Sequence, residues 1–393
     1  MRAFTLQIPT LIRFGGGALE SLGSDVASLG SRALLVYGGG SIKGNGVYDT
    51  VREQLTGAKV TIIEYAGVQP NPLLSHAMEG ARLAYKEQVD LVVAVGGGSV
   101  IDEAKAIALG AGDLAVHGEE SSLWDYYDRS RTIDSEQPVM PVLAVQTLPA
   151  SSSEVNPVSV LTNDETREKF SIRSPRIAPR VAYLDPETTL SIPLEYTAYA
   201  CTDILSHVME GYFTSTDPWA PVHDGMVEGL ARGVIDSMNR LMKNPKDLEA
   251  RSAVMWAGTF AWSGLFNAGV EGATIPNHML EHPLSAHYGI AHGAGLSICI
   301  PGWLKYVKTR IPERIVRFGR EVLRIDASAP EPVIDALEEW YRSIGTPTTF
   351  AAAGLKSIDL DACVDQALTL GKLWRVSGYS SDDIRAIYRL CEG

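Results

Sequence analysis

Cysteine is scarce in this sequence of 393 residues, and the four that occur are widely scattered, with no C-x-x-C pair. That spacing argues against a disulfide framework and a thiolate zinc site, and it indicates a reducing compartment. The first residues lack the apolar core of a secretory signal, and no run of about 18 apolar residues follows. Basic residues are also in deficit, at 34 against 47 acidic residues, and they form no run. We therefore expect a soluble, cytoplasmic protein that binds neither nucleic acid nor a membrane.

The chain is longer than a single core usually supports, so two domains are expected. Short apolar runs alternate with helical patterns in the first half, which predicts an α/β domain with a parallel, Rossmann-like sheet over residues 1–187. Amphipathic helical patterns then follow one another, which predicts an all-helical domain over residues 188–393. The segment 157–172 reads instead as a hairpin that turns at Asn163 and Asp164. The five predicted strands begin the runs "ALLVYGGG" from Ala33, "KVTIIEY" from Lys59, "DLVVAVGGG" from Asp90, "PVLAVQTLP" from Pro141 and "RVAYLDP" from Arg180.

Two of these runs end in a glycine cluster that is followed by a serine. In "DLVVAVGGGSVIDEAKAIA" three glycines would let backbone N–H groups approach a ligand, and the N-terminus of the next helix favours an anion such as phosphate. The segment "VYGGGSIK" repeats the design, although neither run has the G-x-G-x-x-G spacing. The serines of "TLPASSSEVN" could donate hydrogen bonds to a cofactor at the end of another strand. An ordinary glycine turn and a solvated serine loop are the alternatives.

Histidine is concentrated in the predicted helical half, which holds six of the eight histidines. Asp203 and His207 are spaced i,i+4, so both side chains project from one helix face and can share a metal ion. His278 and His282 repeat this spacing, and His287 and His292 follow them, the latter after an expected helix break at Gly289. One carboxylate with two or three imidazoles suits a divalent metal such as Zn²⁺ or Fe²⁺. Spacing alone leaves open which of the four later histidines bind the metal.

Four motifs together, "GGGSVIDEAKAIA", "TLPASSSE", "DILSHVMEGY" and "HMLEHPLSAHYGIAHG", resemble the iron-containing (group III) alcohol dehydrogenase family. The resemblance covers nearly the whole chain and is strongest to NADPH-dependent butanol dehydrogenases and aldehyde reductases. It implies a dehydroquinate synthase-like architecture, with a dinucleotide-binding α/β domain and a helical domain that binds the metal and carries catalysis. It also implies hydride transfer between NADP(H) and a primary alcohol or aldehyde, and we expect a homodimer.

The resemblance also implies a role for individual residues. The metal would be held by Asp203, His207, His278 and His292, with His282 outside the ligand set and near the substrate. This chain departs from the common "TGSE" form of one motif, because Ser152 replaces glycine. The residues implied in the dinucleotide site are Gly38, Gly39, Gly40, Ser41, Asn71, Gly96, Gly97, Gly98, Ser99, Asp102, Thr147, Ser151 and Lys169.

A bound divalent metal would act as a Lewis acid on the alcohol oxygen. With one carboxylate and three neutral imidazoles, we count a net positive charge at such a site.

A lyase or cyclase of the dehydroquinate synthase type is the alternative, but its anionic substrate requires clustered Lys and Arg. This chain supplies an apolar set instead, Trp256, Phe260, Trp262 and Phe266, which is better matched to an uncharged substrate, although these residues could also simply fill a helix core. A nucleotide-binding or metal-storage protein without turnover is a third reading.

The choice between NADP(H) and NAD(H) depends on the "VYGGGSIKGNG" turn. NAD-selective enzymes commonly place a carboxylate at the ribose 2′-OH, which repels a 2′-phosphate. No acid occurs from Leu34 to Tyr48, and Lys43 adds a positive charge. We therefore expect a preference for NADP(H), although Lys43 could also be a solvated loop cation.

Overall fold

A computed structural model describes residues 2–393 of the chain, apart from the side chain of Glu119. The chain divides into two compact units. One unit is Gln7–Ile192, and the other consists of Pro193–Gly393 together with the described residues 2–6. The α/β-then-helical fold class expected from the sequence is confirmed. The division falls between Ile192 and Pro193, and the first residues of the chain belong to the helical unit, where Arg2 donates from its backbone N–H to the Gly269 carbonyl at 3.0 Å.

A six-stranded parallel sheet forms the centre of the α/β unit, in the order β1-β8-β5-β4-β2-β3. Residues 91–95 of its inner strand β4 are fully buried, as expected for a parallel strand that is covered on both faces. All five predicted strands are present, whereas the edge strand β1 was not predicted. The strands of the sheet are β1 (Leu11–Phe14), β2 (Arg32–Tyr37), β3 (Thr61–Ala66), β4 (Leu91–Gly97), β5 (Val142–Leu148) and β8 (Val181–Leu184).

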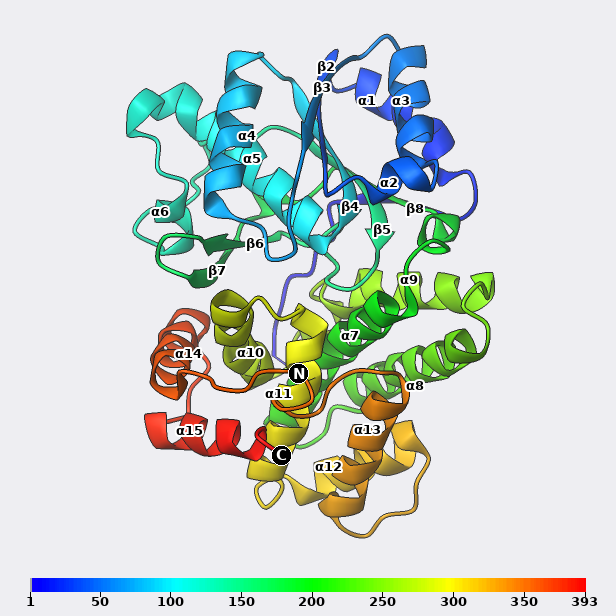
Figure 1. The fold of residues 1–393 in the computed structure, drawn as a ribbon, viewed down its shortest axis with the longest axis vertical. Coiled ribbons are helices and arrows are strands. Elements are labelled where there is room, and N and C mark those ends of the chain that lie inside the picture. Colours follow the sequence, from blue (N-terminus) through cyan, green and yellow to red (C-terminus); the bar gives the residue numbers. More distant parts are fainter. Residues whose placement is uncertain (1) are drawn as a thin grey trace. The chain divides into compact units, whose positions relative to one another are not determined.

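Helices cover both faces of this sheet (Figure 1). On one face, Val26 of α1 and Val51 of α3 belong to the same buried cluster as Leu35 of β2. On the other face, Ala81 of α4 and Ile107 of α5 cluster with Val92 of β4. The helices of this unit are α1 (Leu22–Ala27), α2 (Ser41–Gly44), α3 (Val47–Gly57), α4 (Leu74–Lys86), α5 (Gly98–His117) and α6 (Trp124–Tyr127).

The predicted hairpin is confirmed as a separate two-stranded sheet, β6 (Val158–Asn163) with β7 (Glu168–Arg173). The chain turns through residues 164–167, directly after Asn163 as expected. The hairpin is attached to the loop before α4, because the Thr162 N–H donates to the Pro72 carbonyl at 2.8 Å.

Nine helices make up the described part of the helical unit, and α7 lies at its centre with nearly all residues from 197 to 213 buried. It packs against α8, α9 and α11. An ion-pair network fastens α12 to α8, since the Arg314 guanidinium donates to both oxygens of the buried Asp224 carboxylate. The helices are α7 (Leu194–Thr214), α8 (Pro221–Lys243), α9 (Leu248–Ala261), α10 (Pro276–Tyr288), α11 (His292–Val307), α12 (Pro312–Phe318), α13 (Pro330–Ser343), α14 (Leu360–Trp374) and α15 (Ser381–Leu390).

Within residues 2–393, no helix combines the length and the apolar character needed to cross a bilayer.

Candidate metal and cofactor sites

Asp203 and His207 lie one turn apart on α7, as their spacing predicts, and both are about 5% exposed. Their closest side-chain atoms, Asp203 Oδ1 and His207 Nδ1, are 3.5 Å apart. Both atoms are buried and make no hydrogen bond within the described part of the chain. A buried carboxylate oxygen and a buried imidazole nitrogen left in this state are costly unless another group satisfies them.

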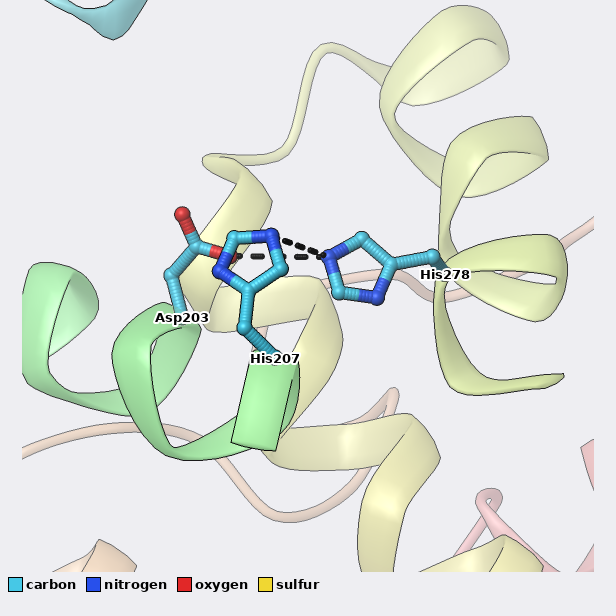
Figure 2. Close-up of side chains that lie close together, drawn as sticks. All are labelled: Asp203, His207 and His278. Atoms are coloured by element: carbon cyan, nitrogen blue, oxygen red, sulfur yellow. Dashed lines mark hydrogen bonds and ion pairs between the residues drawn. The ribbon is translucent and has the colours of Figure 1, made fainter. Parts of the chain in front are cut away.

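Two further histidines reach the same carboxylate from other helices. His278 of α10 places Nε2 3.6 Å from Asp203 Oδ1 and 3.1 Å from His207 Nε2. The α10 helix ends at Tyr288 and is capped by Gly289, whose φ of +66° is the left-handed conformation of a C-terminal cap, so the predicted break is present. The break allows His292, the first residue of α11, to place Nε2 3.7 Å from Asp203 Oδ1. Figure 2 shows Asp203, His207 and His278 with their polar atoms directed toward one another.

Two buried glutamates that the sequence analysis did not identify support these histidines. Glu210 of α7 is hydrogen-bonded to His278 Nδ1, and it also accepts from the backbone N–H groups of Asn277 at 2.5 Å and His278 at 3.1 Å. Glu281 of α10 is hydrogen-bonded to His292 Nδ1 and to the Ser285 hydroxyl. A carboxylate on one ring nitrogen fixes the tautomer and leaves Nε2 free to bind a metal. The spacing Asp203, His207, Glu210 follows one helix face and was the available signal in the sequence.

The side chains of the cluster differ in how their surroundings change their pKa values. Burial lowers the pKa of His207 to about 3. Burial acts in the same direction on His278, but the charge of Glu210, the hydrogen bond with Glu210 and the nearby Asp203 carboxylate outweigh it and raise the pKa to about 10. Burial opposes ionisation of Asp203, yet the neighbouring histidines hold the pKa of that carboxyl well below its usual range. The cluster therefore keeps an ionised carboxylate in a buried position, which is what a bound cation requires.

His282 lies beside this cluster, with ring centroids 5.5 Å from His292 and 6.4 Å from His278. His282, Glu281 and His292 form a second group of closely spaced potential ligands. The ring of Trp374 meets His282 edge-on at 4.8 Å. His287 belongs to neither group of potential ligands.

Of the four aromatic residues proposed to match an uncharged substrate, Trp262 contacts the cluster. Trp262 stacks on His207 at 5.2 Å. Trp256 is 47% exposed and packs edge-on against Phe260, whereas Phe266 is buried. The indole ring of Trp262 therefore covers one face of the His207 ring.

The donor set fits a divalent metal ion. Asp203, His207 and His278 each offer one ligand atom, and these atoms all lie within 4.8 Å of one another. His292 adds an imidazole nitrogen at the same carboxylate oxygen. Oxygen and imidazole donors in this ratio suit Zn²⁺ and Fe²⁺.

In the α/β unit, the polar loops proposed for the cofactor lie at one edge of the sheet. Strands β2, β4 and β5 are neighbours and parallel, so the turns Gly38–Ser41, Gly96–Ser99 and Thr147–Ser151 leave the same edge. This is the edge at which open α/β sheets bind ligands. The 20-residue helix α5 begins at Gly98, so its N-terminus adds unpaired N–H groups there.

Two observations in these loops fit a phosphate group. The Ser151 hydroxyl oxygen is buried and has no hydrogen-bond partner among the described residues. A side chain at Gly98 would collide with that same hydroxyl, so glycine keeps the space between the two loops open. Lys169 of β7 donates from Nζ to Asn71 Oδ1 at 2.9 Å, which brings these two proposed cofactor residues together.

The carboxylate of Asp102, another of the proposed cofactor residues, is held within the protein. Asp102 is buried, and its carboxylate accepts from the Ser153 hydroxyl and from the Val160 N–H at 3.1 Å. The fully buried Lys105 lies 3.8 Å away and donates to Ser153 Oγ at 2.8 Å and to the Val158 carbonyl at 2.6 Å. Asp102 and Lys105 therefore hold the serine loop against α5.

Ser152 of the same loop has a φ of +53°, the left-handed conformation that favours glycine. The family motif described above has glycine at this position. The loop of this chain therefore carries backbone strain that a glycine would avoid.

An acidic side chain that the window Leu34–Tyr48 could not reveal lies beside the glycine turn after β2. Glu64 of β3 accepts from the Tyr37 hydroxyl at 2.7 Å and from the Tyr48 hydroxyl at 2.5 Å. Its carboxylate is 3.9 Å from Lys43 Nζ. Lys43 is therefore paired with an acid and is not a solitary loop cation.

Comparisons with known proteins agree with the resemblance. The family model for iron-containing alcohol dehydrogenase matches residues 9–186, and the model for the C-terminal part of the Fe-containing alcohol dehydrogenase family matches residues 197–391. The chain is 35% identical to a probable NADH-dependent butanol dehydrogenase 1 of Bacillus subtilis, with 99% of both chains covered. It is 32% identical to the NADPH-dependent aldehyde reductase YqhD of Escherichia coli, with 92% of both covered.

Among solved structures, the NADH-dependent butanol dehydrogenase A of Thermotoga maritima superposes with a TM-score of 0.93 at 35% identity, covering 100% of this chain and 99% of the other. These similarities do not favour the lyase reading. The two family models together span nearly all of the chain, and it belongs to the iron-containing alcohol dehydrogenase family of nicotinamide-dependent oxidoreductases that act on alcohols and aldehydes.

Proposed function

We propose that this chain is a broad-range aldehyde reductase or butanol dehydrogenase that transfers a hydride between NADP(H) and a primary alcohol or aldehyde. The observation that carries the proposal is the buried convergence of Asp203, His207, His278 and His292 in a chain of this family. These four residues would hold one Fe²⁺ or Zn²⁺ ion. When bound, the metal supplies Lewis acidity and the nicotinamide supplies or accepts the hydride.

The chain's own residues bind, orient and exclude water. Glu210 and Glu281 hold the rings of His278 and His292 so that Nε2 of each is directed at Asp203. Trp262 and Trp374 provide apolar walls at His207 and His282, which suits an uncharged substrate. We assign His282 to orient the substrate and to relay a proton, because it lies beside the proposed ligands without completing the group around Asp203.

The proposed dinucleotide site uses the three loops at the sheet edge. Gly96, Gly97, Gly98 and Ser99 would hold the pyrophosphate, with Ser151 donating its unpartnered hydroxyl. Thr147, Asn71 and Lys169 would line the remainder, and Asp102 would act from beneath by holding the serine loop.

The proposed preference for NADP(H) rests on Gly38, Gly39, Gly40 and Ser41, with Lys43 as the nearby cation. A carboxylate placed at Gly39 would repel a 2′-phosphate and accept from a 2′-hydroxyl. We therefore expect Gly39→Asp to lower the ratio of kcat/KM for NADPH to that for NADH. Equal or NADH-favouring values in the wild-type enzyme would refute the preference, as would an unchanged ratio in the variant.

We further propose that the protein is a cytoplasmic homodimer and that its substrate is a small alcohol or aldehyde. The negative net charge and the lack of a basic run support the expectation that it binds neither nucleic acid nor a membrane.

The decisive experiment is to purify the protein anaerobically, measure its metal content, and assay NADPH and NADH with a panel of aldehydes. We expect about one divalent ion per chain and oxidation of NADPH with short, uncharged aldehydes. Bound metal and coenzyme without turnover on any aldehyde would refute an oxidoreductase and support a binding protein.

A further inference from the structure

A small aromatic cage, formed by Tyr37, Tyr48 and Glu64, surrounds the ammonium group of Lys43 next to the proposed dinucleotide site. Lys43 Nζ lies 5.0 Å from the Tyr37 ring centroid and 4.6 Å from that of Tyr48. The two rings meet edge to face at 5.7 Å. Ring faces of this kind attract a cation, so the cage favours this position of the ammonium group.

Glu64 closes the cage with a negative charge. Its carboxylate accepts a hydrogen bond from each tyrosine hydroxyl group and lies 3.9 Å from Lys43 Nζ. These hydrogen bonds, together with Lys43, hold the pKa of Glu64 below its ordinary value, so the carboxylate is ionised at neutral pH. Glu64 and Lys43 are both partly exposed, so solvent and ligands can reach the pair.

The cage belongs to the turn that would meet the adenosine ribose. Tyr37 is the last residue of β2 and directly precedes Gly38, while Lys43 is part of α2, which begins at Ser41. Glu64 comes from β3, whose residues 61–66 pair in register with residues 32–37 of β2. The strand pairing therefore delivers an acid from outside the turn to the one lysine within it.

We propose that Glu64 limits the use of NADPH by holding Lys43, so that this pair sets the discrimination between NADPH and NADH. A 2′-phosphate has to compete with Glu64 for the ammonium group, whereas a 2′-hydroxyl does not. The proposal rests on the proposed placement of the dinucleotide at the Gly38–Ser41 turn. It adds to that placement the residue that restrains the cation.

The test compares four variants with the wild type, using both kcat/KM and the dissociation constants of NADPH and NADH from fluorescence titration. Glu64→Gln should raise the NADPH-to-NADH ratio of kcat/KM by about tenfold and lower the NADPH-to-NADH ratio of the dissociation constants by about tenfold, both in favour of NADPH. Lys43→Gln should change both ratios in the opposite directions. In Glu64→Gln/Lys43→Gln the effect of the glutamate change should be much smaller, because the cation on which it acts is gone.

Glu87→Gln is the matched control. Glu87 pairs with Arg32 at 3.4 Å, and Arg32 is the first residue of β2, at the end opposite the glycine turn. This variant removes the same charge and should leave the coenzyme ratio unchanged. An equal change in Glu87→Gln would mean that net charge alone is responsible and would overturn the proposal.

The remaining outcomes separate the inference from the proposed function. An unchanged ratio in Glu64→Gln overturns the role of Glu64, and so does an equally large effect of that change with and without Lys43. A wild-type enzyme that favours NADH, combined with a Glu64→Gln variant that shifts toward NADPH, refutes the proposed preference but supports the cage. Failure of the wild-type protein to bind either coenzyme refutes both.

Discussion

Replacing Glu210 by glutamine tests whether the buried carboxylates prepare the histidines for metal binding. Glu210 is 1% exposed, and one of its oxygens accepts two backbone N–H groups at the start of α10. Its other oxygen is hydrogen-bonded to His278 Nδ1. Glutamine has nearly the same shape but only one acceptor oxygen.

The structure indicates how the amide would settle. Its oxygen would stay with the two backbone N–H groups, since leaving both unpaired in a buried position costs about 1–3 kcal/mol for each group. Its NH₂ group would then face His278 Nδ1 and donate to it, which places the ring proton on Nε2. That nitrogen, 3.6 Å from Asp203 Oδ1, could no longer bind a cation without first changing tautomer.

We expect the metal affinity of Glu210→Gln to fall by about 10- to 100-fold, which corresponds to about 1.4–2.7 kcal/mol. The assay is competition with a chelator of known affinity, carried out anaerobically, followed by measurement of bound metal. Glu228→Gln is the control, because Glu228 is a buried acid of the same unit that pairs with Arg317 at 2.6 Å and with the Tyr212 hydroxyl at 3.0 Å. An affinity within twofold of the wild type in Glu210→Gln, or an equal loss in Glu228→Gln, would refute the reasoning.

Further predictions concern the ligands, the serine loop and one buried acid. Asp203→Ala and His292→Ala should each lose bound metal and activity. Full metal occupancy in either variant would show that the replaced residue is not a ligand. His282→Ala should keep most of the metal while turnover slows; a loss of metal as complete as in His278→Ala would contradict that division. Ser152→Gly should be about 1 kcal/mol more stable than Ser152→Ala in urea unfolding, because both lack the hydroxyl and only alanine keeps the strain at φ +53°; equal stabilities would show that the loop is unstrained. Burial raises the pKa of Glu103 from 4.5 to about 7, although His76 acts to lower it. Between these two pH values the folded protein keeps a proton that the unfolded chain releases, so the free energy of unfolding falls by up to about 3 kcal/mol as the pH rises through this range. Glu103→Gln should therefore gain stability relative to wild type from pH 5 to pH 8, and a constant difference would contradict the assignment.

Much of the fold could be predicted because it is encoded in local patterns. The strands that were identified are short apolar runs, and the inner ones are buried on both faces, so they need no alternation to be recognised. Strand β1 was missed because "LIRF" is only four residues long, contains Arg13 and lies half exposed at the sheet edge. Such a strand is defined by its pairing with β8, which a local pattern does not contain.

The proposed metal ligands could likewise be grouped by spacing within helices, but the residues that support them could not. Asp203 and His207 share one helix face, and Gly289 marks the break that allows His292 to approach. The contact of Glu210 with His278 depends instead on how α7 meets α10, and that of Glu64 with Lys43 depends on the pairing of β2 with β3. Each of these acids acts on a residue from a different element.

The supporting acids also reverse the net charge expected at the proposed metal site. One carboxylate with a divalent ion leaves a net charge of +1, whereas Asp203, Glu210 and Glu281 counted as carboxylates leave −1. The two glutamates are hydrogen-bonded to His278 and His292 on the side away from Asp203, so they make those imidazoles stronger donors. A positive net charge therefore cannot be the reason that an anionic oxygen is stabilised here. The ion, held by these residues, would instead supply a local attraction for the oxygen, which is stronger in a buried setting than in water. Trp262 and Trp374, which pack against His207 and His282, would help to keep that setting dry, so we expect them to affect turnover as well as substrate choice.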